Sequence, residues 1–326
     1  MNEHVFTEYL EVRERSAGLI EFPNRGFVEV SGSESEMFLT GLITNDVKTL
    51  AENIWLNAAF PNAQGRLLAV VKCWKAGGKF YFDTEDKTYE TVLKNLERFT
   101  LAGDFKVADL SGEFACFSVQ GKEIPDFKFE IPNEEKQMIE TDFDGEKLII
   151  LNHADIGEKG FYFYVKQTVA ESFKEYLHEL GIKTVSDQAF EVLRIEAGLP
   201  LYGVDMDDAT VVPEVNLPDL ISYNKGCYIG QEVIARIHFR GRVAKQLTGL
   251  IFEDLSEPSA SAGGLIGAEI KSFDDKNAGK ITSVAYSPKL EKQIALAFVR
   301  YAFLEEGTRL KIGDSTATVK NLPFLK

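Results

Sequence analysis

The sequence predicts an α+β protein with a mixed core over residues 1–242 and a small antiparallel β-domain over residues 243–326. Three observations carry this prediction. Strand-type and helix-type patterns alternate through the first part, whereas only short β-type runs follow Lys245. Hydrophobic residues make up 44% and charged residues 27% of 326, so the chain buries enough apolar surface to fold without disulfides.

The strands of the core are recognised from short apolar or alternating runs. We expect them at Gly26–Val30, Leu67–Trp74, Lys79–Asp83, Leu148–Leu151 and Phe161–Val165. Gly77 and Gly78 separate the second strand from the third and are typical of a hairpin turn.

The helices are recognised from apolar spacing and from end signals. A capping-box pattern at Ser33–Glu36 predicts the start of the first helix, which ends near Thr44. Further helices are expected at Tyr89–Phe99, at Val169–Leu180, at Asp187–Ala197 before Gly198 and Pro200, and from Gln231 onward.

The last part of the chain has no helical period. Its β-type runs are Leu247–Phe252, Lys280–Tyr286, Gln293–Val299, Arg309–Ile312 and Thr316–Val319. Short strands at this spacing predict a small barrel or sandwich, with a domain boundary near residue 243.

The overall charge limits the classes of partner. The chain has 36 basic and 51 acidic residues, a net charge of −15, so as a whole it repels nucleic acid and anionic membranes. Residues 123–146 alone hold nine acids and two lysines, which predicts a solvated loop or hairpin, with a cation or partner site as the alternative. Without a basic, apolar leader or a long apolar run, the sequence predicts a cytoplasmic protein that does not enter membranes.

Common catalytic and metal motifs are missing from the sequence. It contains no dinucleotide-binding glycine motif, phosphate loop, zinc-protease motif or nucleophile elbow. The cysteines Cys73, Cys116 and Cys227 lie far apart, and the four histidines lack metal spacing, so no metal site is expected. Hydrolase and nucleotide-cofactor functions therefore have no support.

A basic segment is the local exception to the acidic charge. Residues 225–245 carry five Lys or Arg and one Glu. Lys225 and Gly226 place a cation and a flexible backbone beside Cys227, and a nearby cation favours the reactive thiolate. The alternative is an inert cysteine in an ordinary loop.

Glu196 is the second candidate site residue. It lies at the end of an apolar helix, just before a Gly-Leu-Pro break, and a carboxylate there requires hydrogen-bond donors. Those donors could be the paired N–H groups of a pterin or guanine. The alternative is a capping or salt-bridged glutamate.

Several segments resemble a known family. Residues 225–236 (KGCYIGQEVIAR) resemble the signature of the YgfZ family, folate-binding proteins linked to maintenance of iron–sulfur enzymes. Residues 194–200 (RIEAGLP), 38–47 (FLTGLITNDV) and 62–66 (NAQGR) are similar to segments shared with their relatives, the T-proteins of the glycine cleavage system. The resemblance covers nearly the whole chain.

The resemblance implies a fold and a cofactor. The fold would be an interwoven folate-binding core with ferredoxin-like elements, followed by a small antiparallel β-barrel around a central channel for tetrahydrofolate. Cys227 would be the reactive thiol beside Lys225. The residues implied in folate binding are Glu196, Gly226, Gln231, Arg236, Arg240 and Arg242.

One departure from the T-proteins bears on the activity. Where they carry catalytic carboxylates after a glycine, this chain has Leu68 and Ala69, which cannot accept a proton. The resemblance therefore implies an accessory protein that binds folate and supports iron–sulfur clusters in client enzymes, including tRNA-modifying radical enzymes. Its partners would be those clients or assembly proteins.

Two alternatives remain open. One is a tetrahydrofolate-dependent aminomethyl or one-carbon transferase. The other is direct RNA binding through residues 225–245, against which the net charge and the lack of interleaved aromatic residues argue.

Overall fold

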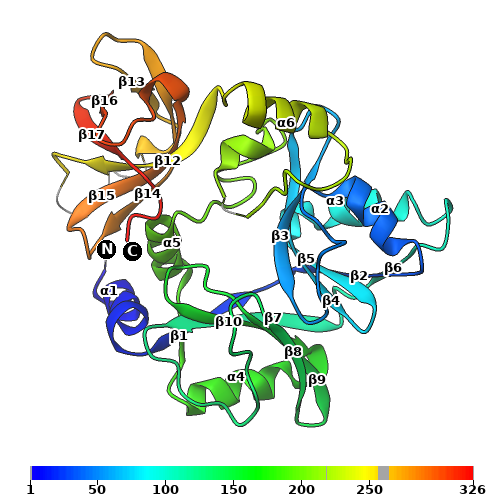
Figure 1. Cartoon of the computed structure of the whole chain (residues 1–326). Coiled ribbons are helices and arrows are strands. Elements are labelled where there is room, and N and C mark those ends of the chain that lie inside the picture. Colours follow the sequence, from blue (N-terminus) through cyan, green and yellow to red (C-terminus); the bar gives the residue numbers. More distant parts are fainter. Residues whose placement is uncertain (1, 218, 256–263, 326) are drawn as a thin grey trace.

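The computed structural model describes residues 2–217, 219–255 and 264–325. A five-stranded sheet, a six-stranded sheet and a closed barrel surround the middle of the molecule (Figure 1). The two ends of the chain lie close together, between the barrel and helix α1 (Glu3–Leu10).

The five-stranded sheet is antiparallel, in the order β3-β4-β5-β2-β6. Its strands are β2 (Gly26–Ser31), β3 (Trp55–Pro61), β4 (Leu67–Ala76), β5 (Lys79–Thr84) and β6 (Lys106–Asp109). Helices α2 (Ser35–Leu42) and α3 (Asp86–Glu97) bring Leu39 and Val92 into one apolar cluster with Val71 and Phe82 of the sheet.

The six-stranded sheet has the order β11-β1-β7-β10-β9-β8. Its strands are β1 (Ala17–Phe22), β7 (Phe114–Gly121), β8 (Met138–Phe143), β9 (Glu146–Asn152), β10 (Lys159–Lys166) and β11 (Lys183–Thr184). Helix α4 (Ala170–Glu179), after a 3₁₀ turn at Gln167–Val169, packs Phe173 and Leu177 into one apolar cluster of this sheet. A different cluster joins the two sheets, with Trp74 of the first beside Tyr164 of the second.

The two sheets are interwoven in the chain. Strand β1 belongs to the six-stranded sheet, the next five strands build the five-stranded sheet, and β7 returns to pair with β1. Helix α1, a π-helical turn (Glu11–Arg15) and helix α5 (Asp187–Ala197) connect this core to the barrel through a shared apolar cluster. The predicted α+β core is confirmed.

The barrel closes in the order β12-β15-β14-β13-β16-β17. Its strands are β12 (Lys245–Phe252), β13 (Glu269–Lys271), β14 (Asn277–Ser287), β15 (Lys292–Arg300), β16 (Arg309–Ile312) and β17 (Ser315–Lys320), with a 3₁₀ turn at Tyr301–Phe303. Closure removes the exposed edges of this sheet, and Leu250, Ala297 and Val319 belong to one apolar cluster of the barrel. The predicted antiparallel barrel is confirmed.

The helix-end signals had different outcomes. Gly198 ends α5 in the left-handed conformation, at φ 75°, as its sequence context predicts. The prediction of a capping box at Ser33–Glu36 is wrong, because α2 starts at Ser35 and its cap residue, Glu34, makes no side-chain capping hydrogen bond. The Ser33 hydroxyl instead donates to Asp104, 2.9 Å away, since the loop before β6 lies against it.

Two connecting segments complete the path between core and barrel. A 3₁₀ turn (Val212–Val215) and helix α6 (Gln231–Arg240) precede β12. Across the described ranges, no helix has the length and apolarity needed to cross a bilayer.

Candidate functional site

A cavity of about 630 Å³ lies where the core, the segment after α5 and the C-terminal tail meet. Its walls come from β4, the start of α3, the loop between β9 and β10, residues 197–206, residues 216–217, and Leu322 and Pro323. This volume is in the range of small-molecule and cofactor sites. We call it the central cavity.

One wall of the central cavity is aromatic. Phe22 and Tyr162 stack with ring centroids 5.5 Å apart and an interplanar angle of 9°, and Phe190 meets Phe22 edge-on. Leu199 and Leu217 add apolar surface to the same cavity. A planar, partly apolar ligand fits such a wall.

Charged side chains gather beside this aromatic wall. Arg25 donates from Nε and Nη2 to the two carboxylate oxygens of Asp83, at 2.5 and 2.8 Å. Asp155 pairs with the His153 imidazole and accepts a hydrogen bond from the Tyr162 hydroxyl. Burial disfavours ionisation of Asp155, but these neighbours outweigh it and hold its pKa well below the usual range.

Lys72 joins these groups from β4. Its Nζ lies 3.7 Å from a carboxylate oxygen of Asp155, 3.8 Å from one of Asp83, and 4.2 Å from the centre of the Tyr162 ring. Its side chain is only 11% exposed. The ammonium is therefore held over an aromatic face between two carboxylates, inside the cavity wall.

Glu85, just before α3, is a second cavity carboxyl group. It accepts a hydrogen bond from the backbone N–H of Tyr202 at 3.2 Å. Burial raises its pKa above the ordinary value for glutamate. A carboxyl group with a raised pKa in a cavity is suited to proton transfer.

The sequence reasoning missed this group of residues, although signals for it exist. Lys72 interrupts an apolar strand, a place where a charge requires a partner or a function. His153 and Asp155 follow directly after β9, where polar residues at strand ends often form sites. Their convergence with Arg25 depends on how the two sheets pack together.

The segment that begins with Lys225-Gly226-Cys227, called the KGC segment below, is held against the end of α2. Lys225 is 8% exposed, and its Nζ donates to the carbonyls of Ile43 and Asn45 at 2.7 and 2.6 Å. The Ile229 N–H also donates to the carbonyl of Gly41 at 3.0 Å. Burial lowers the pKa of Lys225 to about 8, so the ammonium still predominates at pH 7. Lys225 therefore anchors the loop.

The segments that carry the family resemblance contact one another near the end of α2. Gly230 has φ 79°, and a Cβ there would lie 2.4 Å from the carbonyl oxygen of Asn62, in the turn that contains Gly65. Only a glycine allows this approach without displacement of the backbone. Gln231 then begins α6, and its side-chain amide lies 3.5 Å from the Gly226 carbonyl. Segments 38–47, 62–66 and 225–236 thus form one packed unit.

The three cysteines differ in accessibility. Cys227 is exposed, whereas Cys73 and Cys116 are buried. Burial raises the pKa of both buried thiols well above the ordinary value. Cys227 is not among the residues that line the central cavity, so the structure presents its thiol to solvent at the surface.

Glu196 is fully buried and is not among the residues that line the central cavity. Its Oε1 accepts from the Tyr9 and Ser287 hydroxyls at 2.9 and 2.5 Å, its Oε2 accepts from Arg13 Nε at 3.1 Å, and Arg13 Nη2 lies 3.0 Å from Oε2 in an ion pair. Both oxygens are occupied by the protein itself. This geometry matches the salt-bridged alternative, and we do not place a pterin on Glu196.

The arginines expected near the ligand are also outside the central cavity. Arg236, Arg240 and Arg242 are exposed, and the Arg242 guanidinium lies over the ring of Tyr301, 4.6 Å from its centre. Gly226 and Gln231 lie in the loop beside α2 and do not line the cavity either. The sequence-predicted residues are therefore split between a surface loop, a helix and a buried ion pair.

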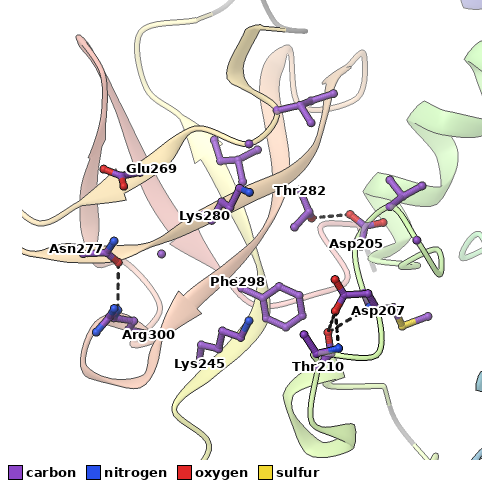
Figure 2. Close-up of a pocket in the computed structure, with 18 residues that line it drawn as sticks. Asp205, Asp207, Thr210, Lys245, Glu269, Asn277, Lys280, Thr282, Phe298 and Arg300 are labelled. Carbon is purple, nitrogen blue, oxygen red and sulfur yellow. Dashed lines mark hydrogen bonds between the residues drawn. The ribbon is translucent and has the colours of Figure 1, made fainter. Parts of the chain in front are cut away.

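A second hollow lies between the barrel and residues 203–210 (Figure 2). Lys245, Lys280 and Arg300 extend from the barrel strands on one side, and Asp207 lies on the opposite loop. Asp205 is already engaged by hydroxyl groups of Thr282 and Ser283 and by Arg194. This hollow is exposed, and its charges have both signs.

The positions where the resemblance implied a departure from the T-proteins lie on β4, next to residues that line the cavity. Ala69 is buried under α2 and α3, and Leu68 is partly buried against the same cluster, but neither residue lines the cavity. The lining side chains of β4 include Val70 and Lys72. Among the residues that the structure describes, no group of three or more His, Cys, Asp or Glu could hold a metal ion.

Comparison with known proteins gives a consistent result. Residues 1–225 match the family described as GCVT N-terminal domain, and residues 245–326 match the Glycine cleavage T-protein C-terminal barrel domain. The chain is 25% identical over 328 residues to an aminomethyltransferase of Caldanaerobacter subterraneus, covering 95% of this chain and 84% of that protein. It is 28% identical over 331 residues to an aminomethyltransferase of Bacillus mycoides, covering 95% and 87%.

A solved structure resembles the whole molecule. The glycine cleavage system aminomethyltransferase T from Bartonella henselae superposes with a TM-score of 0.85 at 21% identity, covering 98% of this chain and 89% of that one. This likeness shows the fold. Together with the matches over both parts of the chain, it establishes that this protein belongs to the glycine cleavage T-protein family.

Proposed function

We propose that this protein binds a reduced folate, such as tetrahydrofolate, in the central cavity. The observation that carries the proposal is a cavity of about 630 Å³ with a stacked aromatic wall next to a charged cluster, in a chain of the T-protein family. A pterin is planar and has hydrogen-bonding groups along its edges, so it matches both features.

Calorimetry with a cavity-filling variant tests folate binding. Ala197 lines the cavity, so Ala197→Trp should remove measurable binding of tetrahydrofolate while urea unfolding confirms that the variant is folded. The exposed Ala51 supplies the matched control, and Ala51→Trp should bind like the wild type. Failure of the wild type to bind tetrahydrofolate would overturn the proposal, and so would equal binding by Ala197→Trp.

The first candidate for the reaction that uses the bound folate is aminomethyl or one-carbon transfer. The relatives are named aminomethyltransferases, which supports this chemistry at the level of the family. Because β4 carries Val70 and Lys72 at the cavity, proton transfer would depend on Glu85 or on the paired His153 and Asp155. We therefore expect the wild type to release ammonia from an aminomethylated lipoyl carrier when tetrahydrofolate is present. Ala197→Trp should lose this activity.

The second candidate is the accessory role implied by the YgfZ resemblance. The observation that favours it is the exposed Cys227, in a loop that Lys225 fixes to the end of α2. In this function the protein would bind folate and serve iron–sulfur client or assembly proteins in the cytoplasm. A deletion strain would then lose iron–sulfur enzyme activity, with rescue by the wild type and not by Cys227→Ala, and the purified protein would release no ammonia.

A further inference from the structure

Lys72 has no hydrogen-bond acceptor among the residues that the structure describes. Its nearest carboxylate oxygens are 3.7 and 3.8 Å away, beyond hydrogen-bond distance, although its side chain is only 11% exposed. An ammonium group at this depth is costly unless its N–H donors find acceptors. The two acids and the Tyr162 ring compensate its charge, but the donors remain available to the cavity.

The other basic side chains of the central cavity are bound to carboxylates or lie at its exposed edge. Arg25 uses its guanidinium on both oxygens of Asp83. His153 is paired with Asp155. Lys87 is exposed at the first turn of α3 and contacts the region of Gly203. Lys72 is therefore the cation best placed to meet a ligand inside the cavity.

The surroundings of Lys72 indicate which part of a ligand it meets. Its ammonium lies over Tyr162, and Tyr162 stacks with the partly exposed Phe22, so a donor and an aromatic ring of the cavity wall lie close together. A planar heterocycle with a carbonyl at its edge can use both features together. A flexible chain that ends in carboxylates would pair with the ammonium but would make no stacking contact with the aromatic wall.

Resting on the proposed function, we propose that Lys72 is the pterin-binding cation of the central cavity. Its ammonium donates a hydrogen bond to the ring carbonyl oxygen, and the pterin lies against the partly exposed Phe22 ring, which stacks on Tyr162. Asp83 and Asp155 hold the ammonium in position. Lys72 is thus a ligand-binding residue that occupies the cavity side of β4.

The test measures two fragments of folate separately by calorimetry. The probes are tetrahydrofolate, a tetrahydropterin without the tail, and p-aminobenzoylglutamate. Lys72→Met should weaken binding of tetrahydrofolate and of the tetrahydropterin at least tenfold, as expected for loss of a charged hydrogen bond. Lys75→Met removes a lysine from the same strand that does not line the cavity, and it should bind like the wild type.

A second measurement needs no variant. Acetylation of Lys72 in the wild type, followed by peptide mass spectrometry, should slow at least severalfold when tetrahydrofolate is present, whereas acetylation of Lys75 should not change. This result stands even if Lys72→Met fails to fold.

The outcomes separate this proposal from the proposed function. If the wild type binds tetrahydrofolate and neither Lys72→Met nor acetylation shows an effect, the role of Lys72 is overturned while folate binding stands. If Lys72→Met weakens only p-aminobenzoylglutamate, the cation meets the tail and the orientation proposed here is wrong. If the wild type binds none of the three probes, both proposals fail.

Discussion

Replacement of Glu196 should destabilise the protein and leave folate affinity unchanged. In Glu196→Ala, Arg13 keeps a side chain that is only 5% exposed but loses its buried carboxylate, and the Tyr9 and Ser287 hydroxyls lose their acceptor. Removal of one partner from a buried ion pair costs about 3–5 kcal/mol. We therefore expect the free energy of unfolding, measured with urea, to fall by about that amount.

A matched variant tests the physical reason. Glu158 also contacts Arg13, at 3.2 Å, but its side chain is 25% exposed. Because solvent can replace a partly exposed partner, Glu158→Gln should cost no more than about 1 kcal/mol. Calorimetry on folded Glu196→Ala should give the tetrahydrofolate affinity of the wild type. Unchanged stability together with lost affinity would refute this reasoning and return Glu196 to the pterin site.

Three further predictions concern the loop, the cysteines and the cavity acid. Lys225→Met should lower the free energy of unfolding by about 3 kcal/mol in urea titrations, because two carbonyls at the end of α2 lose a charged donor. Iodoacetamide near pH 7 should label Cys227 well before Cys73 and Cys116, as read by peptide mass spectrometry, and equal labelling of the three would contradict the burial seen here. Burial raises the pKa of Glu85, so the folded state binds the proton of this carboxyl group more tightly than the unfolded chain does. The stabilisation from this protonation is complete below the unfolded pKa of about 4.5 and is lost as pH rises through the raised pKa. Glu85→Gln should remove that part of the pH dependence of the free energy of unfolding measured with urea.

Much of the fold could be predicted because it depends on local patterns. The helix at Asp187–Ala197 and the hairpin at Gly77 and Gly78 follow from apolar spacing and from residues that permit a positive φ. Strands β1, β3 and β7 were missed. The bounds of β1 and β7 are set by pairing with partners distant in the chain, as when Leu19 of β1 meets Val119 of β7.

The candidate site was predicted only in part. The KGC segment was correctly singled out as unusual, and the structure packs it with segments 38–47 and 62–66. The structure adds an anchoring role for Lys225, because its ammonium binds carbonyls at the end of α2, and its role beside Cys227 stays a prediction. The resemblance implied a central channel, but Lys72 and Asp155 were not singled out, because the residues that line the cavity come from strands and loops of two different sheets.

The sequence by itself determined the class of the fold, the barrel at the end of the chain and the relation to the T-proteins, whereas membership of the YgfZ family stays a prediction. Fold class, barrel and this relation depend on local periodicity, turn residues and long contiguous motifs. Tertiary structure alone decided what each charge does. Glu196 is satisfied by Tyr9, 187 residues away, and by Ser287, 91 residues away, whereas Lys72 meets two carboxylates without a hydrogen bond. The function of a buried charge depends on the partners that packing brings to it, and local sequence does not contain those partners.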